Sequence, residues 1–242
     1  MRRLTLFAAA ALLAFAPGQA FAQNINSGAQ LRFTGVPDAQ VATWDNVYVG
    51  PYEGVLQSDP TQPQLTLYCI DFAHGVSQGD SWYVNVTGLT GSSSFSNTRL
   101  AAEAPSTSLL RYRKAAYLTT LFEANTSRSD FSGIHAAIWR IMTPGFPNLP
   151  GVNNPSLALS LAQPWLAMAE QAADDGFVGM NWDEWKVLSD VTASGHSGGK
   201  QEYLTRVTVT PEPETWALMF TGLLALGFFA RRRIRELDSD LA

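Results

Sequence analysis

The chain has little cysteine, histidine or charge. Its 242 residues include one cysteine, Cys69, which excludes an intramolecular disulfide and any zinc site built from several cysteines. Basic side chains number 16 against 21 acidic ones, and a net charge of −5 argues against a nucleic-acid partner. Charged residues are only 15% of the chain and hydrophobic residues 46%, so a charge-rich disordered protein is excluded and a folded core is expected.

The sequence also has no pattern typical of a cofactor site. The three histidines, His74, His135 and His196, are far apart along the chain, and their spacing does not predict a metal site. The glycines are dispersed and form no phosphate-binding loop. We therefore expect neither a metal ion nor another cofactor.

The amino terminus has the pattern of a secretory signal. Two arginines precede an apolar run from Leu4 to Phe15, and a small-x-small triplet that ends at Ala22 fits the requirement of a signal peptidase. We expect residues 1–22 to direct export by the Sec route and the mature chain to begin at Gln23.

The carboxyl terminus, residues 211–242, combines three features in a fixed order. An uncharged stretch of 15 residues, Trp216 to Ala230, predicts a single transmembrane helix that would span about 22 Å. The basic cluster behind this stretch predicts a cytoplasmic carboxyl terminus and an extracytoplasmic main domain. The motif before the stretch is Pro211, Glu212 and Pro213, and the cluster behind it is Arg231, Arg232, Arg233 and Arg235.

This order of motif, apolar helix and arginine cluster resembles the PEP-CTERM sorting signal of Gram-negative bacteria. The resemblance implies a membrane protease of the exosortase type as a partner. It also implies a transient anchor in the inner membrane, cleavage near the Pro-Glu-Pro motif, and delivery to the cell surface or to an extracellular exopolysaccharide (biofilm) matrix.

The span 23–210 suits one extracellular domain. Segments rich in β-branched and aromatic residues come first, helical periodicity follows, and strand patterns return at the end. This order favours an α+β fold, with an antiparallel sheet or sandwich and an inserted helical subdomain. We expect Asp130 to cap the second helix and Pro164 to kink or restart the third. The expected strands are 30–36, 45–49, 65–70, 82–86, 185–188 and 203–209, and the expected helices are 108–124, 130–142 and 157–173.

Two short motifs within this domain suggest a chemistry. Tyr68-Cys69-Ile70-Asp71 and Ile134-His135-Ala136-Ala137-Ile138-Trp139 together resemble the thioester domains of bacterial surface adhesins. In that family the cysteine joins a glutamine of the second motif in an internal thioester. His135 stands at the position of that glutamine, and an imidazole has no acyl carbon. The resemblance therefore implies a thioester-domain-like fold in which the thioester has been lost.

We favour the first of three interpretations of the domain and keep the other two as alternatives. The first is a non-catalytic surface or matrix protein that contacts exopolysaccharide or other matrix proteins, in which Cys69 and His135 are buried structural residues. The second is an acyl-transfer or hydrolytic enzyme that uses Cys69 as nucleophile beside His135. The third is a polysaccharide-binding module in which Trp182 and Trp185 stack on sugars, although core aromatics are commoner.

The segment 195–199 matches the pattern G-x-S-x-G of a nucleophile elbow. A strand pattern follows it where the elbow needs a helix, and no histidine lies downstream of Ser197. We therefore expect a Gly/Ser turn with no catalytic role.

Overall fold

The computed structural model describes residues 25–37, 42–44, 46–60, 62–124, 127–193, 195–207 and 223. One compact unit extends from Gln23 to Val209. The predicted signal peptide lies outside the described residues, and so does the sorting tail apart from Leu223. Within the part of the chain that is described, no helix is long and apolar enough to cross a bilayer.

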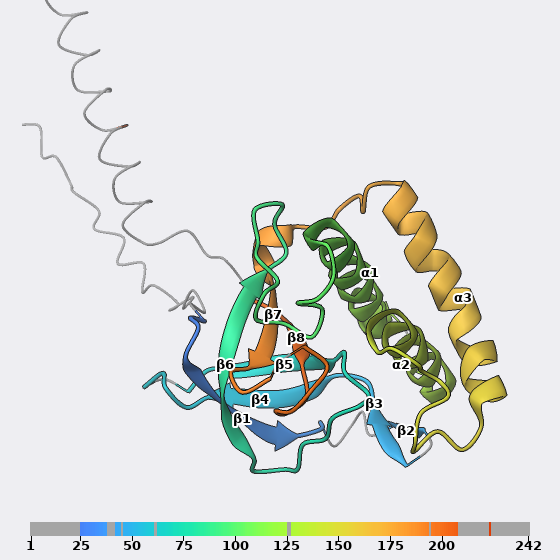
Figure 1. Ribbon diagram of the computed structural model, residues 1–242, viewed down its shortest axis with the longest axis horizontal. Helices are drawn as coiled ribbons and strands as arrows, with labels where there is room; N and C mark the ends of the chain where they lie inside the picture. Colours follow the sequence, from blue (N-terminus) through green and yellow to red (C-terminus); the bar gives the residue numbers. More distant parts are fainter. Residues whose placement is uncertain are drawn as a thin grey trace, which may run out of the picture. The chain divides into compact units, whose positions relative to one another are not determined.

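Six antiparallel strands form a closed barrel in the order β1-β4-β5-β8-β7-β6 (Figure 1). Inward and outward side chains alternate along the strands, as in β4, where every second residue is buried. Closure pairs β1 with both β4 and β6, so the main sheet has no open edge. The strands are β1 (Ala29–Gly35), β4 (Tyr52–Leu56), β5 (Gln64–Cys69), β6 (Ser81–Gly88), β7 (Trp185–Asp190) and β8 (Tyr203–Arg206).

A separate two-stranded hairpin, β2 (Ala42–Trp44) with β3 (Val47–Val49), lies between β1 and β4 in the chain. Its turn includes Asn46, which has a positive φ of 66°. Asparagine is one of the few residues that adopt this conformation readily, which suits a tight hairpin turn. The hairpin contacts α2, as the lower right of Figure 1 shows.

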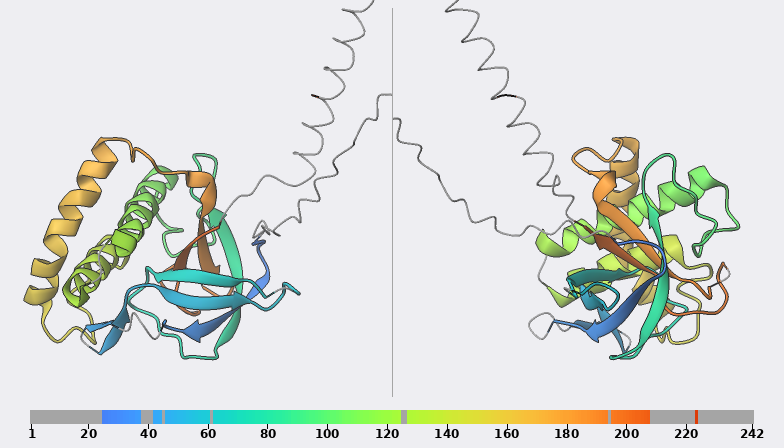
Figure 2. Two further views of the ribbon diagram at one scale, coloured as in Figure 1. Left: turned by 180° about the vertical axis from the view of Figure 1, so that it is seen from behind. Right: turned by 90° about the vertical axis from the view of Figure 1, so that its left-hand side faces the viewer.

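Three helices are inserted between β6 and β7: α1 (Pro105–Ala124), α2 (Arg128–Met142) and α3 (Pro155–Asp174). They gather on one side of the barrel, and α3 is the outermost (Figures 1 and 2). The central helix, α2, is the most buried, because α1 and α3 pack against it as well as the hairpin. Its small residues Gly133, Ala136 and Ala137 permit close packing; a Cβ on Gly133 would lie 2.3 Å from Nε1 of Trp165.

The predicted α+β class, the antiparallel pairing and the inserted helices are confirmed, but the sheet closes into a barrel, so the alternative of a sandwich is wrong. The sequence analysis also missed β4, because Gly54 interrupts its strand pattern. A Cβ at Gly54 would lie 2.6 Å from Leu67 Cδ1 and 3.1 Å from the carbonyl oxygen of Arg32. Glycine is therefore needed there for the close approach of neighbouring strands.

Two local predictions about the helices are also resolved. The cap of α2 is Ser127, whose hydroxyl accepts from the backbone N–H of Asp130 at 3.0 Å, so the prediction of Asp130 as cap is wrong. Pro164 lies inside one continuous α3 and does not start a new helix.

A buried charged network joins the helical insertion to the barrel. Arg99, in the segment before α1, is 3% exposed, and its Nε donates to Oδ2 of Asp71, just past β5, at 2.9 Å. Its terminal nitrogens donate at 2.7–3.2 Å to four carbonyl oxygens of the β7–β8 loop. Those carbonyls belong to Gly195, Ser197, Gly198 and Lys200.

Glu202, directly before β8, extends this network. Its carboxylate accepts from the backbone N–H of Arg99 at 2.9 Å, the hydroxyl of Ser189 at 2.5 Å and the hydroxyl of Tyr112 at 2.7 Å. One side chain therefore links β7, α1 and the segment before α1. Burial disfavours the charged form and raises the pKa of Glu202 from its usual 4.5 to about 7.

We expect Glu202 to make stability depend on pH. A raised pKa means that the folded state holds this proton more tightly than the unfolded state. Its stabilising contribution is full below pH 4.5 and is lost as the pH rises through about 7, up to about 3 kcal/mol in the free energy of unfolding. Urea unfolding at pH 5 and pH 7.5 should show this loss in the parent, and a smaller loss in Glu202→Gln.

The matched control for this measurement is Glu123→Gln, which changes an exposed carboxylate. Its pH dependence should equal that of the parent. An equal pH dependence in Glu202→Gln and the parent would contradict the assignment.

Candidate functional site

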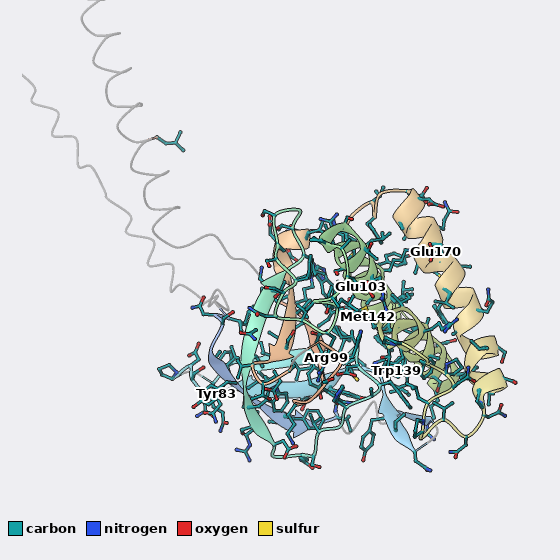
Figure 3. All side chains as sticks on the ribbon, viewed as in Figure 1. Tyr83, Arg99, Glu103, Trp139, Met142 and Glu170 are labelled. Atoms are coloured by element: carbon teal, nitrogen blue, oxygen red, sulfur yellow. The ribbon has the colours of Figure 1, made fainter. Side chains whose placement is uncertain are left out.

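The fold brings the two motif segments together at the junction of the barrel and α2. Cys69 is the last residue of β5, His135 lies on α2, and both side chains are fully buried. They share a neighbour, Trp139, which Figure 3 labels. The indole of Trp139 lies near Cys69, and its ring stacks parallel to that of His135 with centroids 4.8 Å apart. Within the described chain, no hydrogen bond joins Cys69 to His135 directly.

The imidazole of His135 serves as an acceptor for the backbone. The N–H of Gly50, in the turn between β3 and β4, donates to its Nδ1 at 2.8 Å. Nδ1 must therefore lack a hydrogen, and the neutral ring carries its proton on Nε2. Burial lowers the pKa of His135 from 6.5 to about 3, so the ring is neutral at physiological pH. A ring in this tautomer has no free lone pair with which to take a proton from a thiol.

Gly50 is suited to this contact. Its φ of 109° is favoured by glycine, and a Cβ there would lie 3.0 Å from the ring of Phe131. The backbone can therefore approach α2 closely enough to reach His135. The contact fixes the start of β4 against the helical insertion.

The thiol of Cys69 is protonated and enclosed. Its Sγ lies 3.4 Å from the carbonyl oxygen of Asp71, to which it donates. Burial first, and the nearby charge of Asp71 second, raise the pKa of the thiol from 9.0 to about 12, against the lowering effect of its hydrogen bond to the Asp71 carbonyl. Because the thiolate is the nucleophile, this environment suppresses reactivity at neutral pH.

Asp71 belongs to a different cluster from His135. Its carboxylate pairs with the guanidinium of Arg99, and Nδ1 of His74 lies 2.8 Å from its Oδ2. The sequence analysis missed this cluster because Arg99 is distant in the chain and carries no local pattern. Across the described ranges, no three His, Cys, Asp or Glu side chains gather in a set that could hold a metal ion.

Trp182 and Trp185, the two residues predicted to stack on sugars, do not form an exposed aromatic surface. Trp185 is 2% exposed and packs in the core, where its ring centroid lies 6.3 Å from that of Tyr68. Trp182 is half-buried; the guanidinium of Arg113 covers its ring at 4.6 Å from the centroid, and Phe177 meets it edge-on at 5.2 Å. Both indoles are thus engaged in packing.

The segment 195–199 forms a turn in the β7–β8 loop, as predicted. Gly195, Gly198 and Gly199 all have positive φ values, which suits a glycine-rich turn. The carbonyl of Ser197 accepts from Arg99, and the next element after the segment is the strand β8 rather than a helix. The geometry of a nucleophile elbow is therefore missing from these described residues.

We expect Cys69 to resist alkylation in the folded protein. The side chain is fully buried, and a pKa of about 12 leaves about one thiol in 10⁵ ionised at pH 7. Incubation with iodoacetamide at pH 7, followed by intact mass measurement, should show no adduct until guanidinium chloride unfolds the chain. Glutathione serves as the reactive control. Alkylation of the folded protein at a rate close to that of glutathione would show an activated, accessible thiol.

Comparison with known proteins identifies a sorting motif in the tail and finds no match for the barrel domain. The model of the PEP-CTERM protein-sorting motif matches residues 209–233, which include the predicted Pro-Glu-Pro motif, the apolar stretch and three of the arginines. No curated protein matches the chain. No solved structure matches it either. The resemblance to thioester domains is therefore not supported by these comparisons, whereas the sorting motif of an exported, exosortase-processed protein is found.

Proposed function

We propose that this chain is an exported protein that an exosortase processes and releases, and that its barrel domain acts on the cell surface or in an exopolysaccharide matrix as a non-catalytic component. The observation that carries the proposal is the sorting motif at 209–233. This motif begins three residues after Arg206. Arg206 ends β8, the last barrel strand along the chain. The sorting motif thus follows directly after the folded domain in the sequence.

The composition of the tail supports a transient anchor. The stretch 216–230 is uncharged, and the arginines behind it favour a cytoplasmic carboxyl terminus. Cleavage near Pro211–Pro213 would separate the barrel domain from this anchor. The inner membrane and the exosortase are then temporary partners, and exopolysaccharide or matrix proteins are the lasting ones.

The geometry of the Cys69 junction supports a role without catalysis. An acyl-transfer enzyme needs a nucleophile and a base within reach of the substrate. Here the thiol is neutral and fully buried, and His135 uses its lone pair on the backbone N–H of Gly50. These features favour the structural reading of the pair over the Cys69/His135 enzyme.

The same junction supports the absence of a thioester. A thioester would form when the Cys69 sulfur displaces ammonia from a carboxamide. His135 has no carboxamide, and the thiol of Cys69 donates to the carbonyl oxygen of Asp71. The proposal therefore includes a free Cys69 thiol in the mature protein.

The test is the intact mass of the extracellular protein from a Gram-negative host with an exosortase, and from the same strain without it. We expect a mature chain that begins at Gln23 and ends near residues 211–213, only in the strain with the protease. After unfolding, iodoacetamide should add one group, at Cys69. A mass lower by one ammonia, with no alkylation, would contradict the free thiol.

Two sets of variants test whether the Pro-Glu-Pro motif directs processing. Replacing Pro211, Glu212 and Pro213 together by alanine should leave an uncut chain in the membrane fraction. The matched control, Asp238→Asn with Asp240→Asn, lies beyond the matched residues and should be processed like the parent. Identical release of the alanine variant and the parent would contradict sorting through this motif.

A further inference from the structure

A cavity of about 760 Å³ lies where several segments distant in the sequence meet. Its walls come from the end of β1, from the β2–β3 hairpin with the start of β4, and from the β5–β6 loop. Trp139 of α2 and Gln201, before β8, complete the lining. We call this space the hairpin cavity. A volume of this size lies within the range of pockets that hold small molecules.

Aromatic rings form one part of its lining. Tyr52, Phe72 and Trp139 supply buried or half-buried rings, and Phe72 meets Trp139 edge-on at 4.9 Å. Tyr48, on β3, is 50% exposed. The cavity therefore combines a fixed aromatic wall with an exposed tyrosine that is available to a ligand.

Polar groups held by the protein form the other part. A carboxylate only accepts hydrogen bonds, so the Nδ1 of His74 carries the hydrogen that faces Asp71 at 2.8 Å. The other ring nitrogen, Nε2, bonds to no described residue and is left to bond a ligand. Gln201 is oriented by the hydroxyl of Tyr203, which donates to its Oε1 at 2.8 Å.

These walls are preorganised by the network that surrounds Arg99. Asp71, which orients His74, is itself fixed by the guanidinium at 2.9 Å. The backbone N–H of Phe72 donates to the hydroxyl of Thr143 at 3.2 Å, which attaches the β5–β6 loop to the end of α2. A ligand would therefore meet rings and polar groups that already have their bound positions, which reduces the entropic cost of binding.

The charge of the lining selects the class of ligand. None of the described residues that line the hairpin cavity is Asp, Glu, Lys or Arg. Phosphorylated or strongly acidic ligands would therefore find no counter-charge there. Aromatic faces suit the C–H faces of a sugar ring, and amide and imidazole groups suit its hydroxyls.

We propose that the hairpin cavity binds a neutral saccharide of one or two sugar units, with Tyr48 stacking on a ring and His74 and Gln201 bonding its hydroxyls. This site differs from the one predicted at Trp182 and Trp185. The proposal adds a ligand class to the proposed matrix role and so rests on it for its biological setting, but binding itself depends only on the folded barrel domain.

The test uses the full chain with its tail uncut, in a zwitterionic detergent free of sugar groups, so that exosortase processing has no influence. Cellobiose, maltose, lactose and chitobiose are titrated by calorimetry, with glucuronic acid as the charged probe. We expect at least one disaccharide to bind saturably with a dissociation constant of about 1 mM or tighter. Glucuronic acid should bind more weakly.

Matched variants assign the binding to the cavity. Tyr48→Ala removes the exposed ring and should weaken binding about ten-fold or more. Tyr83→Ala removes a tyrosine of similar exposure, 55%, on β6, away from the hairpin (Figures 1 and 3), and should leave affinity unchanged. Ala73→Trp, at an exposed residue of the lining, should block the cavity and abolish binding.

Three results would overturn the proposal. The first is no saturable binding of any of the four disaccharides by the parent chain. The second is unchanged affinity in both Tyr48→Ala and Ala73→Trp. The third is an equal loss in Tyr48→Ala and Tyr83→Ala. Each of these results would leave the proposed export and tail cleavage untouched, because those are measured separately by mass.

Discussion

The buried guanidinium of Arg99 is the constraint around which the rest of the domain is arranged. A guanidinium cannot lose its charge, so burial requires a counter-charge and acceptors for its fixed fork of donors. Asp71 supplies the counter-charge, and four carbonyls of the β7–β8 loop supply the acceptors. One side chain therefore sets the path of a glycine-rich loop, the end of β5 and the entry to the helical insertion.

The remaining polar groups of the core follow from that arrangement. Glu202 accepts from the backbone of Arg99 and links α1 to β7. On the other side of Asp71, His74 and Phe72 are held as the wall of the hairpin cavity. Close packing buries Cys69 and His135 completely, and this burial raises the pKa of the thiol and lowers that of the imidazole. His74 and Gln201, by contrast, line the hairpin cavity.

The sequence predicted what depends on local patterns. Strand alternation and helical spacing gave the α+β class and the three inserted helices, and the order of motifs in the tail gave the sorting signal. Contacts between residues far apart in the sequence could not be predicted. Examples are the pairing of β1 with β6 that closes the barrel, and the hydrogen bonds of Arg99 to Asp71 and to the β7–β8 loop. The sequence left open whether Cys69 and His135 are in contact; the structure shows that both are buried and that the backbone N–H of Gly50 donates to the imidazole of His135.

The central claim is that Arg99 holds the helical insertion and the barrel together as one unit. The direct measurement is the free energy of unfolding of Arg99→Met, compared with Arg32→Met, which changes an exposed arginine of β1. Removing one partner of a buried ion pair leaves Asp71 uncompensated and costs about 3–5 kcal/mol. We predict a loss of that size for Arg99→Met and a loss below about 0.5 kcal/mol for Arg32→Met. Equal small losses in both variants would contradict the claim.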